Sequence, residues 1–114
     1  MPILANARTA VIEPAKFIEY CLDLHHEDGR HKARVFKAAL GFDQTTYADL
    51  IDAIRTGIMQ CEAEYLGETA HGLLWRVDLP ITGPRGSATV RTGWIYEKGT
   101  DVPRLTTAYV LGPR

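Results

Sequence analysis

The sequence predicts an α+β fold in which N-terminal helices pack on a C-terminal four-stranded antiparallel meander sheet. Up to Gly57 the apolar residues recur at helical spacing, and from Ile58 onward the period changes from 3.6 to 2. The strand-like segments follow one another through short turns, a pattern typical of an antiparallel meander. We therefore expect the helices on one face of the sheet and solvent on much of the other face.

Length and composition predict a single domain that covers residues 1–114. The apolar fraction of 46% and the charged fraction of 24% are ordinary for a soluble globular protein. A formal net charge of −1 gives no general attraction to nucleic acid or to anionic membranes, so RNA binding would need a local basic patch. No signal peptide or membrane-spanning run is apparent, and Cys21 and Cys61 have no metal-binding spacing. These features predict a cytoplasmic protein with free thiols and no membrane partner.

Three helices are predicted in the first half of the chain, over residues 13–24, 30–40 and 47–55. Pro14 is tolerated in the first turn of the first helix. Asp28 is expected to cap the second helix, and Gly41 is expected to end it in the left-handed conformation. Thr45 or Thr46 is expected to cap the third helix. Residues 2–11 are expected to be extended, as a short strand or an ordered arm.

The second helix has two kinds of surface. A basic stripe, expected to face solvent, contains Arg30, Arg34 and Lys37. The buried side is expected to contain Ala33, Val35, Phe36, Ala39 and Leu40. His31 and Lys32 precede Val35 and Phe36 by four residues, so they are expected to align with the buried side. A His-Lys pair at the rim of a core is suited to an acid-base or anion site.

Four strands are predicted over residues 60–66, 73–81, 87–96 and 104–111. The second and third have the clearest alternation of apolar and polar residues. One face of the predicted sheet has no expected cover, and its polar residues are Arg76, Asp78, Thr89, Arg91 and Thr106.

Several separated segments carry a resemblance to a known family: GRHKARVF (29–36) with LGF (40–42), LPITGPRG (79–86), TVRTGWI (89–95) and VPRLTTA (102–108). From about Asn6 to Tyr109 the chain resembles a family of small bacterial domains of unknown function. Members of that family look like small stand-alone genes beside another small gene, and like C-terminal modules of polymorphic toxins. The resemblance implies a toxin activity, with a cognate antitoxin or immunity protein as partner. The order of elements is also similar to the metal-independent ribonuclease toxins of the barnase, colicin and RelE type, which implies an RNA substrate.

Metal-free RNA cleavage requires a proton acceptor, a proton donor and cations for the charge on the phosphorane. His31 is the predicted acid or base, while Lys32 and Arg91 are predicted to hold the phosphate. The candidate hydrogen-bond donors to the phosphate are Thr92, Thr106 and Thr107. No cofactor is expected. His25, His26 and His31 lie close in sequence to Glu27 and Asp28, but their spacing matches no recognised metal motif, so no metal is expected either.

Structural alternatives exist for each of these residues. His31 would then cap a helix or fill a core edge, Lys32 would lay its stem over Phe36, and Arg91 would pair with Asp78 across two strands. A second hypothesis for function is a non-catalytic protein-binding module, such as an antitoxin or immunity protein. A third is a building block of a homo-oligomer that pairs through the edge strand. Convergence of His31, Lys32 and Arg91 on one phosphate would favour the enzyme.

Overall fold

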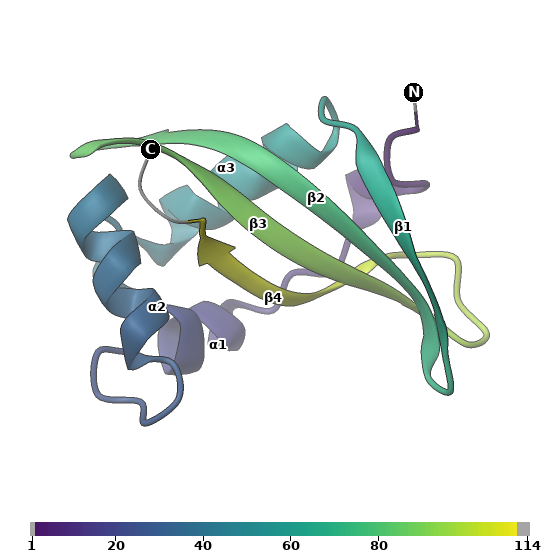
Figure 1. The fold of residues 1–114 in the computed structure, drawn as a ribbon, viewed down its shortest axis with the longest axis horizontal. Helices are drawn as coiled ribbons and strands as arrows, with labels where there is room; N and C mark the ends of the chain where they lie inside the picture. The colour runs from purple at the N-terminus through teal and green to yellow at the C-terminus, as the bar shows by residue number, and fades with distance from the viewer. Residues whose placement is uncertain (1, 112–114) are drawn as a thin grey trace.

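The computed structural model describes residues 2–111. Its main elements are α1 (Pro14–Lys16), α2 (Arg30–Val35), α3 (Tyr47–Ile58), β1 (Ala63–Thr69), β2 (Gly72–Gly83), β3 (Gly86–Glu97) and β4 (Arg104–Val110). Two π-helical turns, Phe17–Cys21 and Phe36–Leu40, continue α1 and α2, and 3-10 turns occupy Ala7–Thr9 and Gln44–Thr46. The strands form an antiparallel sheet in the order β1-β2-β3-β4. The predicted α+β class and four-stranded meander are therefore confirmed, and Figure 1 shows α3 behind β2 and β3, with α1 and α2 toward the β4 side of the sheet.

The core lies between the helices and one face of the sheet. Fully buried side chains that meet there include Phe17, Phe36, Leu50, Ile54, Val77, Leu79, Val90 and Trp94. The opposite face, which we call the open face, faces the viewer in Figure 1. It carries the partly exposed side chains of Arg76, Asp78 and Arg91, as the alternation along β2 and β3 predicts.

The start of α2 differs from the prediction that Asp28 caps it. The helix begins at Arg30 after Gly29, and no side chain caps it. Instead, the Nδ1 atom of His26 accepts hydrogen bonds from the backbone N–H groups of Asp28 and Gly29, at 3.0 and 2.9 Å. At the other end Gly41 has φ 84°, so the predicted left-handed ending is confirmed. The imidazole of His26, rather than the carboxylate of Asp28, therefore accepts hydrogen bonds from the backbone just before the helix.

The buried stripe of α2 and its π-helical continuation is narrower than predicted. Ala33, Phe36 and Leu40 are buried, whereas Val35 is 39% exposed. His31 lies one helical turn before Val35 and is exposed with it, so the prediction that His31 aligns with the core is wrong. Lys32 lies one turn before the buried Phe36 and is half-buried.

The remaining helix boundaries shift for local reasons. The first helix ends at Cys21 rather than Leu24, and its last π-helical bond joins the N–H of Leu22 to the Phe17 carbonyl. Thr46, one of the two threonines expected to cap the third helix, is the N-cap residue of α3, but its side chain makes no capping hydrogen bond. Asp43 caps the preceding 3-10 turn Gln44–Thr46, where its side chain accepts from the Thr45 N–H at 2.9 Å. The helix α3 continues to Ile58, three residues past its predicted end.

The strand boundaries and the N-terminal arm also differ in detail. The N–H groups of Gln60 and Cys61 bond to the Gly57 carbonyl, so β1 starts at Ala63 rather than at residue 60. Residues 2–11 form no strand: they contain the 3-10 turn Ala7–Thr9 and an isolated bridge between Val11 and Arg104, so of the two expectations the short strand is wrong.

Candidate anion-binding hollow on the open face

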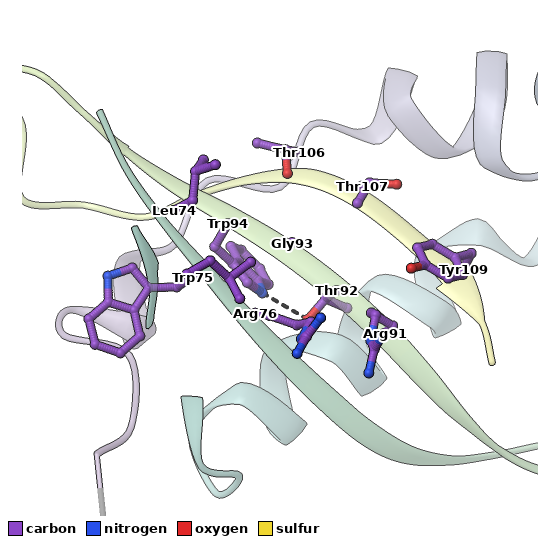
Figure 2. A pocket seen from close by; sticks show the side chains of 11 residues that line it. Leu74, Trp75, Arg76, Arg91, Thr92, Gly93, Trp94, Thr106, Thr107 and Tyr109 are labelled. Carbon is purple, nitrogen blue, oxygen red and sulfur yellow. Dashed lines mark hydrogen bonds between the residues drawn. The ribbon is translucent and has the colours of Figure 1, made fainter. Parts of the chain in front are cut away.

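The open face contains a hollow of about 220 Å³ between β2, β3 and β4 (Figure 2). Gly93 lies at its centre, and the missing side chain leaves the space. A Cβ atom at Gly93 would lie 2.9 Å from the hydroxyl oxygen of Thr106 and 3.0 Å from the methyl group of Thr107. The pairing of β3 with β4 shifts next to Gly93, which brings both threonines to this position. The hollow is also lined by Leu66, Leu74, Arg76, Arg91 and Tyr109.

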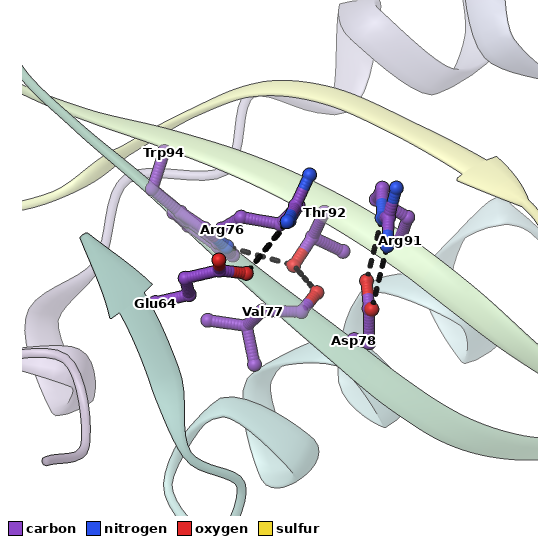
Figure 3. A network of polar contacts seen from close by, with 7 residues as sticks. All are labelled: Glu64, Arg76, Val77, Asp78, Arg91, Thr92 and Trp94. Atoms are coloured by element: carbon purple, nitrogen blue, oxygen red, sulfur yellow. Dashed lines mark hydrogen bonds and ion pairs between the residues drawn. The ribbon is translucent and has the colours of Figure 1, made fainter. Parts of the chain in front are cut away.

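Arg91 is held by Asp78 on the neighbouring strand. Its Nε and Nη2 atoms donate to the two carboxylate oxygens of Asp78, at 2.9 and 3.0 Å (Figure 3). The hydrogen bond from Arg91 lowers the pKa of Asp78, and Asp78 in turn raises the pKa of Arg91. Tyr109 adds a smaller contribution that also raises the pKa of Arg91. The cross-strand ion pair expected as the structural alternative is therefore present, and Arg91 also lies next to a phenol.

Arg76 is held in a similar way by Glu64 from β1. Its Nε and Nη2 atoms both donate to one carboxylate oxygen, at 3.2 and 2.6 Å. The side chain of Arg76 is 30% exposed and that of Arg91 is 28% exposed. Both guanidinium groups are therefore reachable by a solute, although each already has one carboxylate partner.

Lys32, on α2, does not line the hollow but contacts two residues that do, Thr107 and Tyr109. Its Nζ atom donates to the hydroxyl groups of Tyr20 and Thr107, both at 3.2 Å. The same atom lies 4.8 Å from the ring centroid of Tyr20 and 5.4 Å from that of Tyr109. Within residues 2–111 Lys32 forms no ion pair, so its charge is balanced by hydroxyl groups and aromatic faces rather than by a carboxylate.

Thr92 lies on the core side of β3. Its side chain is completely buried, and its hydroxyl donates to the Val77 carbonyl at 2.7 Å. The same hydroxyl accepts from Nε1 of Trp94 at 2.8 Å (Figure 3). With both bonding directions used inside the core, this hydroxyl cannot reach a ligand on the open face. We therefore leave Thr92 out of the candidate site.

The structure brings together three of the five residues predicted for the site. Lys32, Arg91 and Thr107 lie around Tyr109, and of these Arg91 and Thr107 line the hollow. Neither Lys32 nor His31 is among the described residues that line it, but Lys32 bonds to Thr107, whereas His31 is exposed on α2. Sequence reasoning overlooked Tyr109 as a site residue. Its alternation with Thr107 along the last strand was the available signal, since it places both side chains on one face of the sheet.

In the part of the chain that the structure describes, no group of three or more His, Cys, Asp or Glu residues is placed to hold a metal ion. Cys21 and Cys61 are free, as predicted. None of the described helices has both the length and the apolar character needed to cross a membrane.

Comparison with known proteins identifies the family. The family model described as "Domain of unknown function (DUF6883)" matches residues 3–112. The chain belongs to this family. The expected relationship to small domains of unknown function is thereby confirmed, and the hollow of this DUF6883 domain lies within the matched range. Searches of curated proteins and of solved structures found no match.

Proposed function

We propose that this DUF6883 domain is a metal-independent ribonuclease that binds the phosphate to be cut in the hollow of the open face. The observation that carries the proposal is the charge gathered there. Arg76 and Arg91 line the hollow, and their ion-pair partners within residues 2–111 are Glu64 and Asp78. Lys32 does not line the hollow but bonds to Thr107, which does, and its additional charge leaves one net positive charge among these five groups. The chain as a whole has a net charge of −1, so the hollow differs in sign from the average of the molecule.

The reaction would be an internal transesterification. The 2′-oxygen of the ribose attacks the neighbouring phosphorus, the bond from phosphorus to the 5′-oxygen breaks, and a 2′,3′-cyclic phosphate and a 5′-hydroxyl result. One proton leaves the 2′-hydroxyl and one is delivered to the departing 5′-oxygen. Lys32, Arg76 and Arg91 would stabilise the additional negative charge on the phosphorane.

Hydroxyl groups at the hollow complete the proposed site. Thr107 would donate a hydrogen bond to a phosphate oxygen, and the phenol of Tyr109, beside Arg91 and Lys32, would exchange a proton with the substrate. The role of His31 as acid or base stays a prediction from the sequence, since its side chain does not line the hollow.

The test is cleavage of a labelled single-stranded RNA by the purified protein in the presence of a chelator. Lys32→Gln, Arg91→Gln and Tyr109→Phe should each reduce the cleavage rate by roughly a hundredfold, the usual effect of removing one charge-stabilising donor or one proton-transfer group. Arg34→Gln is the matched control, because Arg34 is an exposed cation on α2 and does not touch the hollow.

The outcomes separate the proposed site from other sites. A 2′-deoxy linkage should resist cleavage, and the product should carry a cyclic phosphate. Loss of activity in His31→Ala, with normal cleavage rates in Lys32→Gln, Arg91→Gln and Tyr109→Phe, would indicate that the active site lies around His31 instead of the hollow. Intact RNA with the wild type, at protein concentrations that saturate RNA binding, would refute the proposal.

A second candidate function is a non-catalytic protein-binding module, and two observations favour it. Arg91 is already engaged by Asp78, and the edge strand β1 exposes the large apolar side chains of Tyr65 and Leu66, which are 50% and 49% exposed. This candidate predicts intact RNA and normal growth when the wild type is expressed in bacteria. A homo-oligomer through β1 is also a prediction, and it would bring the glutamates of that strand together.

A further inference from the structure

We infer that Glu64 and Asp78 are positioning residues, which hold Arg76 and Arg91 as a clamp for two consecutive phosphates of a single-stranded nucleic acid. The inference rests on the proposed function and specifies its substrate. It concerns binding, and therefore it can be tested without cleavage.

The first step is the geometry of the two ion pairs. Each carboxylate accepts from the Nε and Nη2 atoms of its arginine, which form one side of the planar guanidinium group. The end of the group formed by Nη1 and Nη2 is then directed away from the carboxylate. Figure 3 shows the free ends of Arg76 and Arg91 pointing in the same direction. This end can donate two parallel hydrogen bonds to a phosphate.

The second step is the spacing of the arginines. Arg76 pairs with Gly93 across β2 and β3, and Arg91 lies two residues from Gly93 along β3. The two arginines are therefore diagonal neighbours on one face, with Cα atoms about 7 Å apart. This distance is comparable with the step between successive phosphates in an unstacked strand. Gly93 lies beside both side chains and leaves room for the sugar between the phosphates.

The third step concerns the form of the nucleic acid. The hollow is recessed in the sheet, has a volume of about 220 Å³, and is bordered at one end by Leu66 and Leu74. A flexible single strand can turn its phosphates into such a recess and lay a base on apolar side chains. A duplex holds its phosphates on convex ridges, and its bases are not free to pack there.

If Glu64 and Asp78 position the arginines, their loss should change the affinity for an anion in the opposite direction from the loss of a merely nearby negative charge. Loss of a negative charge beside a phosphate site should strengthen anion binding if charge alone matters. Loss of a positioning group should weaken binding, because a released arginine side chain must be ordered again by the ligand. The two effects therefore predict opposite changes in affinity.

The experiment measures binding of fluorescent thymidine oligonucleotides that have one or two internal phosphates. These DNA probes lack the 2′-hydroxyl and cannot be cut by the proposed reaction. We expect Asp78→Asn and Glu64→Gln each to weaken binding of the two-phosphate probe by about fivefold. A probe with one phosphate can engage only one of the two arginines at a time. Its affinity should therefore be reduced by at most one of the two carboxylate substitutions. Glu68→Gln is the matched control, since Glu68 is an exposed carboxylate of β1 outside the two ion pairs.

Each outcome decides between the alternatives. Weaker binding in both carboxylate variants, with unchanged or tighter binding in Glu68→Gln, supports the clamp. Tighter binding in all three variants overturns it, because the carboxylates then act only as competing charges. RNA cleavage is assayed in parallel with the same variants. Wild-type cleavage combined with tighter binding refutes the clamp alone, whereas the expected binding pattern without any cleavage refutes the ribonuclease alone. Failure of the wild type to bind either probe overturns the clamp.

Discussion

The buried hydroxyl of Thr92 is the most testable polar feature of the core. It joins the Val77 carbonyl to the Trp94 indole within a region that is completely buried. Replacement of Thr92 by Val keeps the shape of the side chain but removes the hydroxyl. The indole N–H then has no partner, and the Val77 carbonyl loses one hydrogen bond. We expect Thr92→Val to destabilise the protein.

The size of the effect follows from the groups left without partners. A buried donor that loses its acceptor costs about 1–3 kcal/mol, and a lost hydrogen bond to a carbonyl costs about 1 kcal/mol. Burial of the additional methyl group returns roughly 0.8 kcal/mol, so the net loss should be about 2 kcal/mol. For a domain of this size the corresponding decrease in melting temperature is about 8 °C. Thr92→Ser keeps the hydroxyl and loses only a methyl group, so its cost should be near 1 kcal/mol.

Urea unfolding followed by far-ultraviolet circular dichroism measures both variants without relying on the fluorescence of Trp94. A Thr92→Val protein within about 0.5 kcal/mol of the wild type would refute the reasoning, because the indole would then have found another partner. Oligonucleotide binding by the folded variant should be unchanged. A loss of binding with normal stability would place Thr92 in the functional site, contrary to the geometry.

Three further predictions concern close packing, thiol reactivity and pH. Gly83→Ala should destabilise the protein by about 3 kcal/mol in urea unfolding, because a Cβ there would lie 2.2 Å from the Leu40 carbonyl oxygen. Burial raises the pKa of the Cys21 thiol, so a thiol reagent at mildly alkaline pH should modify only Cys61 in the native protein and both cysteines in urea. Since the pKa of Asp78 is lowered in the fold, its stabilising effect is present above the unfolded pKa of about 3.9 and is lost as pH falls through the lower native value. The stability difference between wild type and Asp78→Asn at neutral pH should therefore shrink as the pH falls below the unfolded pKa and vanish below the lowered native pKa, as urea titrations at decreasing pH can measure.

The order of the elements was predictable because the hydrophobic period changes once and the strands are joined by short turns. Individual boundaries depend on which side chain satisfies the free backbone N–H groups at a helix start, and several candidates usually compete. Before the third helix Asp43 caps the 3-10 turn Gln44–Thr46, and Thr46 is the N-cap residue of α3 without a side-chain hydrogen bond. At α2 no side chain caps the helix, and His26 instead accepts from the backbone N–H groups of Asp28 and Gly29 just before it.

The site was harder to predict because residues that are neighbours in sequence direct their side chains to different surfaces. His31 and Lys32 are neighbours in sequence, but successive side chains of a helix diverge by about 100°. Lys32 therefore meets Tyr20 and Thr107, while His31 points to solvent. The same limit applies to Thr92, which lies beside Arg91 in sequence but on the opposite face of β3.

The register of β4 on β3 is the property that the sequence alone could not supply. Thr92 pairs with Ala108 and Gly93 with Thr107, but Trp94 pairs with Leu105, so one residue of β4 is additional between these pairs. That residue is Thr106, and the irregularity lets the buried positions Leu105 and Ala108 lie three residues apart instead of two. In a regular strand one of the two intervening threonines would face the core. Here both reach the space above Gly93, and the polar character of the hollow follows from a single additional residue in an edge strand.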